Sequence, residues 1–376
     1  MIPKRYQLKK DAVAIVGRGH PWLFREQMSS AASVFRDGQW LRLVDGANRV
    51  IAHGIYEASG AIAIRMVPSG DATPGAMWVR DQLARSIATR DPLAARTTGV
   101  RLVHGESDGL PAVVVDRFGD VAVVASYSAG SDALARFVAS ALPDRHVLWR
   151  PARRRLGEAL PQRALRGSPP AIAHFVEDGI DFAVDLAEGH KTGAYLDLRG
   201  LRRAIATEPL AGKRVLNLFA YTGMLGRAAE RAGAAEIVHA DQSARALEFA
   251  RAHHVDDPAK HRFIELDLFE ALPEGQFDLV IVDPPAMTSR RDQVPRVLAA
   301  YRRLYAAARE RVAPGGALVA ACCTSRIERR VFRDTVAAAL GDGFALERDL
   351  PAEPDHPVGF PQADYLKIGW WRAKSR

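Results

Sequence analysis

The spacing of apolar and polar positions changes twice along the chain. Up to about residue 74, apolar and polar residues alternate in short runs such as WLRLVDG (40–46), RVIAHGIY (49–56) and AIAIRMV (61–67), and Asp45-Gly46 and Ser59-Gly60 interrupt them. Such alternation between turn residues is typical of half-buried strands. The pattern predicts a small β-barrel-like module over residues 1–74.

Residues 75–172 form a second zone with longer apolar periods. The period over 76–89 predicts an amphipathic helix, LPAVVVDRFGDVAVVASY (110–127) predicts two strands, and 131–142 predicts another helix. The zone ends in a segment with six arginines between Arg150 and Arg166, followed by Pro169-Pro170. We interpret the zone as a middle α/β domain that ends in a solvated basic linker.

Strands and helices alternate in the third zone, residues 173–376. Apolar runs at 214–219, 236–241, 262–267, 278–283 and 317–323 predict strands, and helical periods such as 244–253 and 297–312 lie between them. Two further strands are expected at 344–350 and 365–371. Such alternation predicts a parallel sheet with helices on both faces. Ligands of these sheets bind beyond the carboxyl ends of the strands.

Composition narrows the class of protein. The chain has 376 residues, of which 48% are hydrophobic and 26% charged, and a formal net charge of +8. The length indicates two or three domains, and the charge favours a polyanionic partner, although ordinary solubility charge is the alternative. Cys322 and Cys323 are the two cysteines of the chain and are adjacent, so neither a disulfide nor an oxidising compartment is expected. The apolar runs are too short for a signal peptide or a membrane span, and we expect a cytoplasmic protein that does not contact a membrane.

Polar residues at successive strand ends predict a cofactor site. Asn217, Asp241, Asp267 and Asp283 end four predicted strands, and the first turn, NLFAYTG, contains Gly223 but no G-x-G-x-x-G. A carboxylate after the second strand suits the ribose hydroxyls of a nucleoside without phosphates, and the next suits an adenine amino group. S-adenosylmethionine fits this pattern, and no metal is expected. The alternative is that each Asp only caps the following helix.

The sequence DPPAM (283–287) and the two cysteines predict the reaction. Two prolines hold the Asp283 carboxylate in one direction, where it could bind the ring nitrogen and amine of a flipped base. Side chains alternate on a strand, so we expect Cys323 to face the cleft and Cys322 to pack in the core. A thiolate is the nucleophile that could add to C6 of cytosine and activate C5. The alternative is a pair of core cysteines.

The chain resembles, over nearly its whole length, the bacterial large-subunit ribosomal RNA cytosine-C5 methyltransferases that carry an N-terminal PUA domain (RlmI-like enzymes). The motifs that carry the resemblance are GHPWLF (19–24), GESDGLPAVVVDRFGD (105–120), GHKTGAYLDLR (189–199), NLFAYTG (217–223), VDPP (282–285), CTS (323–325) after PGGALVAAC, DHP (355–357) and YLK (365–367).

This resemblance implies a PUA-like domain, a middle α/β domain and a Rossmann-like, seven-stranded domain that uses S-adenosylmethionine. It implies large-subunit ribosomal RNA as the partner, and a homodimer is left open. The residues expected at the site are Cys323 and Asp283 for catalysis; Asn217, Phe219, Tyr221, Gly223, Asp241, Asp267, Asp283, Lys191, Thr192, Tyr195, Asp197 and Arg199 for the cofactor; and Pro284, Pro285, His20, Trp22 and Arg25 for the RNA. For GHPWLF, a turn packed by Trp22 and Phe24 is the alternative.

The chain departs from the family pattern after the two prolines. Ala286 and Met287 stand where the family has a basic and an aromatic residue. Relatives that use a second cysteine to release the product carry it just after the DPP sequence, and this loop has none. Two other functions are alternatives: methylation of another ribosomal RNA atom such as guanine N7, which needs no thiol, and RNA binding without catalysis.

Overall fold

The computed structural model of the protein describes residues 2–29, 34–70, 72–152, 154–155, 158–288 and 290–374. The chain divides into two compact units, one made of Met1–Leu196 with Pro354–Phe360 and the other of Asp197–Glu353 with Pro361–Arg376. The hairpin of residues 172–185 therefore groups with the first unit. The domain boundaries expected at residues 74 and 172 stay predictions.

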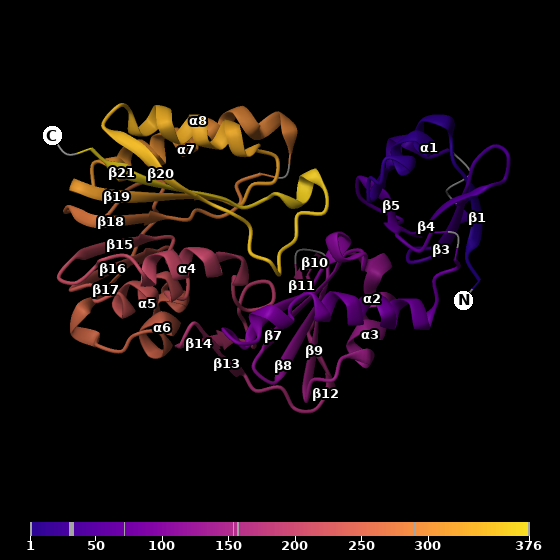
Figure 1. Ribbon diagram of the computed structural model, residues 1–376, viewed down its shortest axis with the longest axis horizontal. Helices are drawn as coiled ribbons and strands as arrows, with labels where there is room; N and C mark the ends of the chain where they lie inside the picture. The colour runs from indigo at the N-terminus through magenta and orange to yellow at the C-terminus, as the bar shows by residue number, and fades with distance from the viewer. Residues whose placement is uncertain are drawn as a thin grey trace. The chain divides into compact units, whose positions relative to one another are not determined.

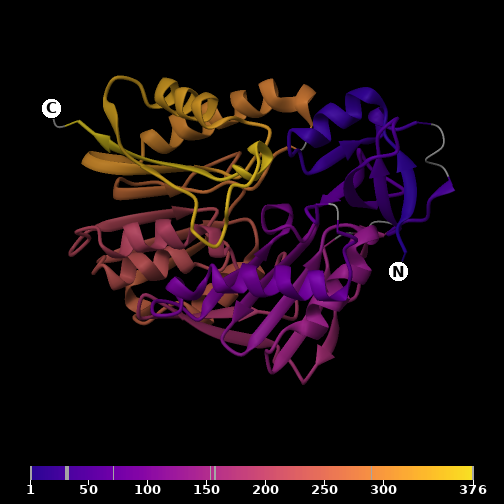
Figure 2. The ribbon, with the colours of Figure 1, turned by 45° about the vertical axis from the view of Figure 1, so that its right-hand side comes forward.

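The N-terminal part of the first unit is a five-stranded sheet with one helix (Figures 1 and 2). Its elements are β1 (Lys4–Gln7), α1 (Lys10–Gly17), β2 (Trp22–Phe24), β3 (Trp40–Val44), β4 (Val50–Tyr56) and β5 (Ile62–Val67), in the spatial order β1-β3-β4-β5-β2. Alternate residues such as Leu41 and Leu43 of β3 are fully buried, and Ala12 of α1 belongs to the same core. The small β module expected from the alternating pattern is present.

A second sheet of the first unit follows. Its elements are α2 (Ala76–Ala88), β6 (Gly99–His104), β7 (Val113–Phe118), β8 (Val121–Ser126), α3 (Asp132–Ala141), β9 (His146–Pro151) and β12 (Arg163–Arg166), in the order β12-β9-β8-β7-β6. Only the β8–β9 pair is parallel, and α3 supplies its crossover. Two hairpins accompany the sheet: β10 (Arg154–Arg155) with β11 (Glu158–Ala159), and β13 (Ile172–Glu177) with β14 (Ile180–Asp185).

The segment interpreted as a solvated basic linker is part of this unit instead. Positions 153, 156 and 157 lie outside the described residues, but β12 pairs with β9 and so continues the sheet. Arg150 is buried, and its guanidinium donates to the carbonyl oxygens of Leu186, Gly189 and Lys191. The linker interpretation does not hold at Arg150 and β12, because the Arg150 guanidinium is bonded to carbonyl oxygens of the 186–191 segment and β12 is paired in the sheet.

The second unit is a doubly wound α/β domain. Its elements are α4 (Arg199–Ala206), β15 (Arg214–Leu218), α5 (Met224–Arg231), β16 (Glu236–Asp241), α6 (Ala244–His253), β17 (His261–Glu265), β18 (Phe277–Val282), α7 (Val294–Arg309), β19 (Val312–Cys322), α8 (Arg329–Leu340), β20 (Phe344–Leu350) and β21 (Lys367–Ala373). The seven strands have the order β17-β16-β15-β18-β19-β21-β20. Figure 1 shows α7 and α8 on one side of the sheet and α4, α5 and α6 on the other.

One strand departs from the parallel arrangement that the pattern predicted. β21 lies between β19 and β20 and is antiparallel to both, while β15 to β19 are parallel to one another. The chain returns from β20 to β21 without a crossover helix, and an antiparallel pair needs none. None of the helices in the described ranges is long and apolar enough to span a membrane.

Candidate active site

The loop after β15 has an unusual backbone. Phe219, Tyr221 and Gly223 have φ angles of 58°, 47° and 79°, in the left-handed region that side chains other than glycine seldom adopt. A Cβ at Gly223 would lie 2.8 Å from Cβ of Ala250 in α6, so this position has no room for a side chain. Such backbone strain persists only where surrounding contacts hold it.

Asp241, the last residue of β16, holds this loop. Its Oδ2 accepts a hydrogen bond from the Tyr221 backbone N–H at 2.8 Å, and its Oδ1 accepts one from the Ser243 N–H at 2.9 Å. Each carboxylate oxygen keeps a second lone pair for a ligand. Asp267 follows β17, is exposed, and accepts the Phe269 N–H through Oδ1 at 3.0 Å. Both carboxylates therefore stabilise local turns and present oxygens at the strand ends, whereas the N-cap of the following helix α6 is Ser243 and not Asp241, as the helix-cap alternative would require.

Asn217 lies deeper than the sequence indicated. It is fully buried in β15, and its Nδ2 is 3.4 Å from Nδ1 of His239 in the neighbouring strand. Burial lowers the pKa of His239 to about 3, so this imidazole stays neutral. A Cβ at Gly226 would lie 2.1 Å from Cε1 of His239, so the helix α5 rests directly on that ring. Asn217 therefore contacts the neighbouring strand, and its contact with the cofactor stays a prediction.

Asp283, Pro284 and Cys323 come together at the ends of β18 and β19. Asp283 is half-buried and directly follows β18. Cys323 is the residue after β19; it is half-buried, and its Sγ lies 3.8 Å from the carbonyl oxygen of Pro284. Pro285 and Ala286 are exposed beside them. The thiol therefore lies against the loop that carries the carboxylate.

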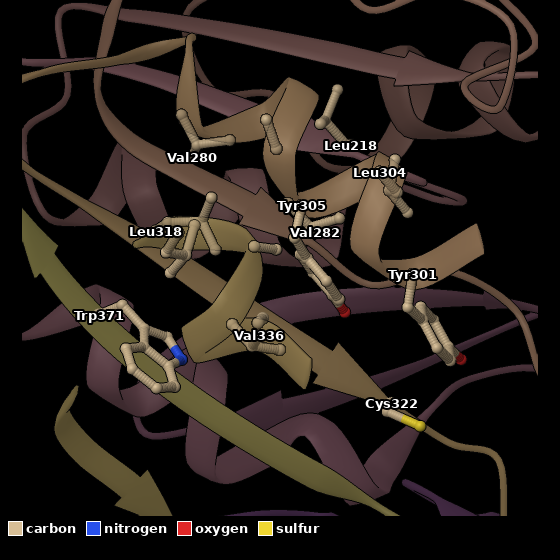
Figure 3. Close-up of a cluster of buried hydrophobic side chains, with 14 of the residues drawn as sticks. Leu218, Val280, Val282, Tyr301, Leu304, Tyr305, Leu318, Cys322, Val336 and Trp371 are labelled. Atoms are coloured by element: carbon tan, nitrogen blue, oxygen red, sulfur yellow. The ribbon is translucent and has the colours of Figure 1, made fainter. Parts of the chain in front are cut away.

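Cys322 points to the other face of the same strand. It is fully buried in the cluster that packs the sheet against α7 and α8, and Figure 3 shows it at the same end of the cluster as Tyr301. Tyr301 donates to or accepts from Oγ1 of Thr324 at 3.2 Å, and burial raises the pKa of its phenol. The alternation of the strand thus separates the two cysteines in the predicted way, while the role of Cys323 stays a prediction.

The 189–199 segment crosses from the first unit to the second. In the first unit, Lys191 has a φ of 53°, and its ammonium lies 4.7 Å from the ring centroid of Tyr195. Thr192 is fully buried and donates a hydrogen bond to Asp116. In the second unit, Asp197 accepts a hydrogen bond from the Tyr365 phenol at 2.6 Å. Arg199 is buried and pairs with Glu353 at 3.2 Å. The five predicted residues of this segment are therefore anchored separately in the two units.

The three predicted RNA-binding residues in and directly after GHPWLF make contacts within the first unit. Nδ1 of His20 accepts the Trp22 N–H at 3.1 Å, and Nε1 of Trp22 donates to Glu106 at 2.8 Å. The Arg25 guanidinium donates to the carbonyl oxygens of Glu57 and Gly60. These contacts fit the packed-turn alternative, and direct contact with RNA stays a prediction.

Comparison with known proteins identifies the family. A family model of S-adenosylmethionine-dependent methyltransferases matches residues 135–367, and a model of a PUA-like domain matches residues 7–68. The chain belongs to the S-adenosylmethionine-dependent methyltransferase family. Among the relatives, ribosomal RNA large subunit methyltransferase I of Shewanella amazonensis is 34% identical and covers 96% of this chain and 98% of its own. Ribosomal RNA large subunit methyltransferase of Deinococcus radiodurans is 32% identical and covers 96% of each.

Solved structures have the same fold as this methyltransferase. A crystal structure described as a methyltransferase complexed with SAH is 20% identical, has a TM-score of 0.85 and covers 98% of this chain and 100% of its own. A SAM-dependent methyltransferase from Streptococcus mutans has a TM-score of 0.83 at 20% identity, with the same coverage. The expected fold class, a PUA-like domain with a Rossmann-like methyltransferase domain, is confirmed.

The strand-end residues of the methyltransferase fit S-adenosylmethionine. Asp241 and Asp267 present carboxylate oxygens at neighbouring strand ends, and the left-handed loop at 219–223 brings backbone close to them through the Asp241–Tyr221 bond. The rings of Phe219 and Phe269 pack at a tilt with centroids 5.3 Å apart, which adds an apolar surface beside Asp267. These groups would hold the ribose and adenine of the cofactor.

Sequence reasoning missed three residues that shape this site. His239 supports α5, Tyr365 holds Asp197, and Lys367 bonds to the backbone after Cys323. Only YLK (365–367) carried a signal, as part of the family resemblance. The position of His239 inside an apolar strand, two residues before Asp241, could have indicated a buried polar contact.

We expect Asp241→Ala to weaken binding of S-adenosylmethionine by about 10- to 100-fold, because charge-assisted hydrogen bonds contribute about 1.5–3 kcal/mol. Isothermal titration calorimetry with the cofactor would measure the loss. Asp257→Ala is the matched control, since Asp257 makes the same kind of turn bond, from the Ala259 N–H at 3.1 Å, outside the strand ends. Equal losses in both variants would show that Asp241 acts only on its turn.

Proposed function

We propose that this methyltransferase forms 5-methylcytosine in large-subunit ribosomal RNA, with Cys323 as nucleophile and Asp283 as its partner. The substrate class follows the names of the relatives, which are ribosomal RNA large subunit methyltransferases. The observation that carries the chemistry is the half-buried thiol of Cys323, whose Sγ lies 3.8 Å from the carbonyl oxygen of the residue after Asp283. Methyl transfer to a nucleophilic ring nitrogen would not require a thiol there.

In this proposal the chain first activates the base. The Cys323 thiolate forms a bond to C6 of a flipped cytosine, and the electron pair of the C5–C6 double bond moves toward C5 and the ring. The Asp283 carboxyl group lies on the ring-nitrogen side and stabilises or protonates the adduct. Pro284 and Pro285 fix the loop in an extended form, so the carboxyl group keeps one direction against the base.

Methyl transfer and release complete the reaction. When bound, S-adenosylmethionine would supply an electrophilic methyl group: as the bond to C5 forms, the S–CH3 bond would break and S-adenosylhomocysteine would leave. A base then removes the C5 proton, the electron pair re-forms the C5–C6 double bond, and the Cys323 thiolate leaves. The loop after Pro285 contains Ala286 and Met287 instead of a second cysteine. The proton acceptor in this step is therefore a different base or water.

RNA docking is proposed for the first unit. The PUA-like match over residues 7–68 lies there, and the net charge of +8 favours binding to phosphates. His20, Trp22 and Arg25 are already bonded inside the unit, so we propose that they shape this surface rather than reach single bases.

Methylation of unmodified large-subunit RNA by the purified protein tests the function. We expect transfer of labelled methyl groups to the RNA, followed by one new cytosine that resists bisulfite conversion. A labelled RNA whose cytosines all convert would reject the cytosine-C5 proposal. Cleavage at a guanine after mild reduction and aniline treatment would then identify the alternative function, methylation at guanine N7.

A further inference from the structure

Lys367 is a buried cation next to the end of the strand that the candidate nucleophile follows. It is the first residue of β21, is only 1% exposed, and is the register partner of Cys322 at the end of β19. Side chains of directly opposed residues in an antiparallel pair lie on the same face of the sheet, so the Lys367 side chain leaves β21 on the face of Cys322 and approaches Cys323 at the strand end, where its ammonium bonds to the next residue, Thr324. A lysine is seldom buried this deeply unless its ammonium group is paired.

The ammonium group of Lys367 joins two chain segments of the site. Its Nζ donates to the carbonyl oxygen of Thr324 at 2.8 Å and to that of Tyr365 at 2.7 Å. Thr324 directly follows Cys323, so the first bond fixes the backbone at the nucleophile. The phenol of Tyr365 donates to Asp197 at 2.6 Å, so the second bond connects this point to the segment expected at the cofactor.

Few acidic groups balance the positive charge of the Lys367 ammonium. Burial lowers the pKa of Lys367, and the neighbouring Cys322, Asp364 and Cys323 act in the opposite direction. Asp364 is engaged by Arg329 of α8 at 2.9 Å, and that guanidinium also lowers the pKa of Lys367. Tyr301 of α7 faces Cys322 and stays neutral because burial raises its pKa. On the side of the loop after β18, Asp283 is the acidic group near Cys323.

We propose that Lys367 is the positioning residue of Cys323, which holds the backbone after the nucleophile and stabilises its thiolate with a buried positive charge. The role in catalysis rests on the proposed function, but the effect on the thiol does not. A cation in a site of low polarity favours the thiolate over the thiol. The same cation holds the Thr324 carbonyl, so the thiolate forms without a change in backbone.

Alkylation of Cys323 by iodoacetamide tests this role without RNA or cofactor. All variants carry Cys322→Ala, so that one thiol reacts, and the rate is measured from pH 6 to 10 by mass spectrometry. We expect Lys367→Met to slow alkylation at pH 7 by about tenfold and to leave the rate at pH 10 within about twofold, because one unit of thiol pKa changes the thiolate fraction about tenfold. A merely structural role would change the rate equally at every pH.

Further variants keep the test decisive. Lys367→Gln is uncharged but can still donate to a carbonyl, so it should give the same shift if the Met variant does not fold. Lys367→Arg keeps the charge and should stay within about threefold of the parent at pH 7. Lys213→Met, which removes an exposed lysine bonded to Asp278 of the same sheet, should leave the profile unchanged. Superimposable profiles for the parent and both uncharged variants would overturn the proposal.

The two proposals can fail separately. If the alkylation profile shifts as expected but ribosomal RNA gains no 5-methylcytosine, Lys367 acts on the thiol and the proposed function is wrong. If RNA is methylated at cytosine C5 and the profiles coincide, the proposed function stands and Lys367 has no role at the thiol.

Discussion

Cys323→Ala is expected to abolish covalent trapping of RNA that contains 5-fluorocytidine and to lower methyl transfer by at least about a thousandfold, as removal of a catalytic nucleophile usually does. After addition of the thiolate and methyl transfer, C5 of the analogue carries fluorine where cytosine carries a proton. No base can remove that fluorine, so the Cys323–C6 bond persists. Denaturing electrophoresis of the RNA–protein complex measures trapping.

Cys322→Ala is the matched control because it removes the adjacent sulfur from the opposite face of β19. Cys322 is fully buried among apolar side chains, so its loss should reduce stability slightly and leave trapping intact. Loss of trapping in the Cys322 variant alone would show that the strand presents the other thiol. Full methyl transfer by Cys323→Ala would support a target that needs no covalent adduct, such as guanine N7.

Asp116→Ala is expected to destabilise the second sheet of the first unit by about 3–5 kcal/mol, the usual cost of leaving a buried charge without its partner. Asp116 of β7 is fully buried and accepts two hydrogen bonds from the Arg101 guanidinium at 2.8 Å each. It also accepts a bond from Thr192, so the variant should loosen the 189–199 segment as well. Hydrogen exchange of peptides from β6, β7 and that segment would measure the local free energy of opening.

Arg96→Ala is the matched control for this prediction. It removes an ion pair of the same kind in the same unit, but the Arg96 side chain is 48% exposed and its Nη2 lies 2.7 Å from Asp178. Exposed pairs contribute less than about 1 kcal/mol, so exchange in β6 and β7 should change little. Similar losses in the two variants would mean that water reaches the Arg101–Asp116 pair.

The parts of the candidate site that depend on neighbouring residues in the sequence were predictable. Asp241, Asp267 and Asp283 follow strands whose apolar runs are visible in the sequence, and they lie at the strand ends in the structure. Cys322 is buried in the core, and Cys323, directly after β19, is half-buried against the Pro284 carbonyl, as expected from the alternation of side chains along a strand. The contact of Asn217 with His239 was not predictable, because it depends on which strand lies beside β15 and in what register.

The local sequence also gave a wrong prediction for Arg150, because the arginines that follow it in the chain indicated a solvated linker. The structure buries its guanidinium against three carbonyl oxygens that come 36 to 41 residues later. Composition indicates the average environment of a segment, whereas the environment of Arg150 depends on the distant part of the chain that packs against it.

By itself, the sequence determined the succession of strands and helices, the glycine and carboxylates at the strand ends, and the face of each cysteine, since these follow from periods of two to four residues. The tertiary structure alone decided the partners of the buried charges: Lys367 with the Thr324 carbonyl, Asp116 with Arg101 and Thr192, and the Asp355 carboxylate with the Arg101 N–H, 254 residues away. A buried charge must find a partner, but which one it finds depends on strand order and register across distant parts of the chain.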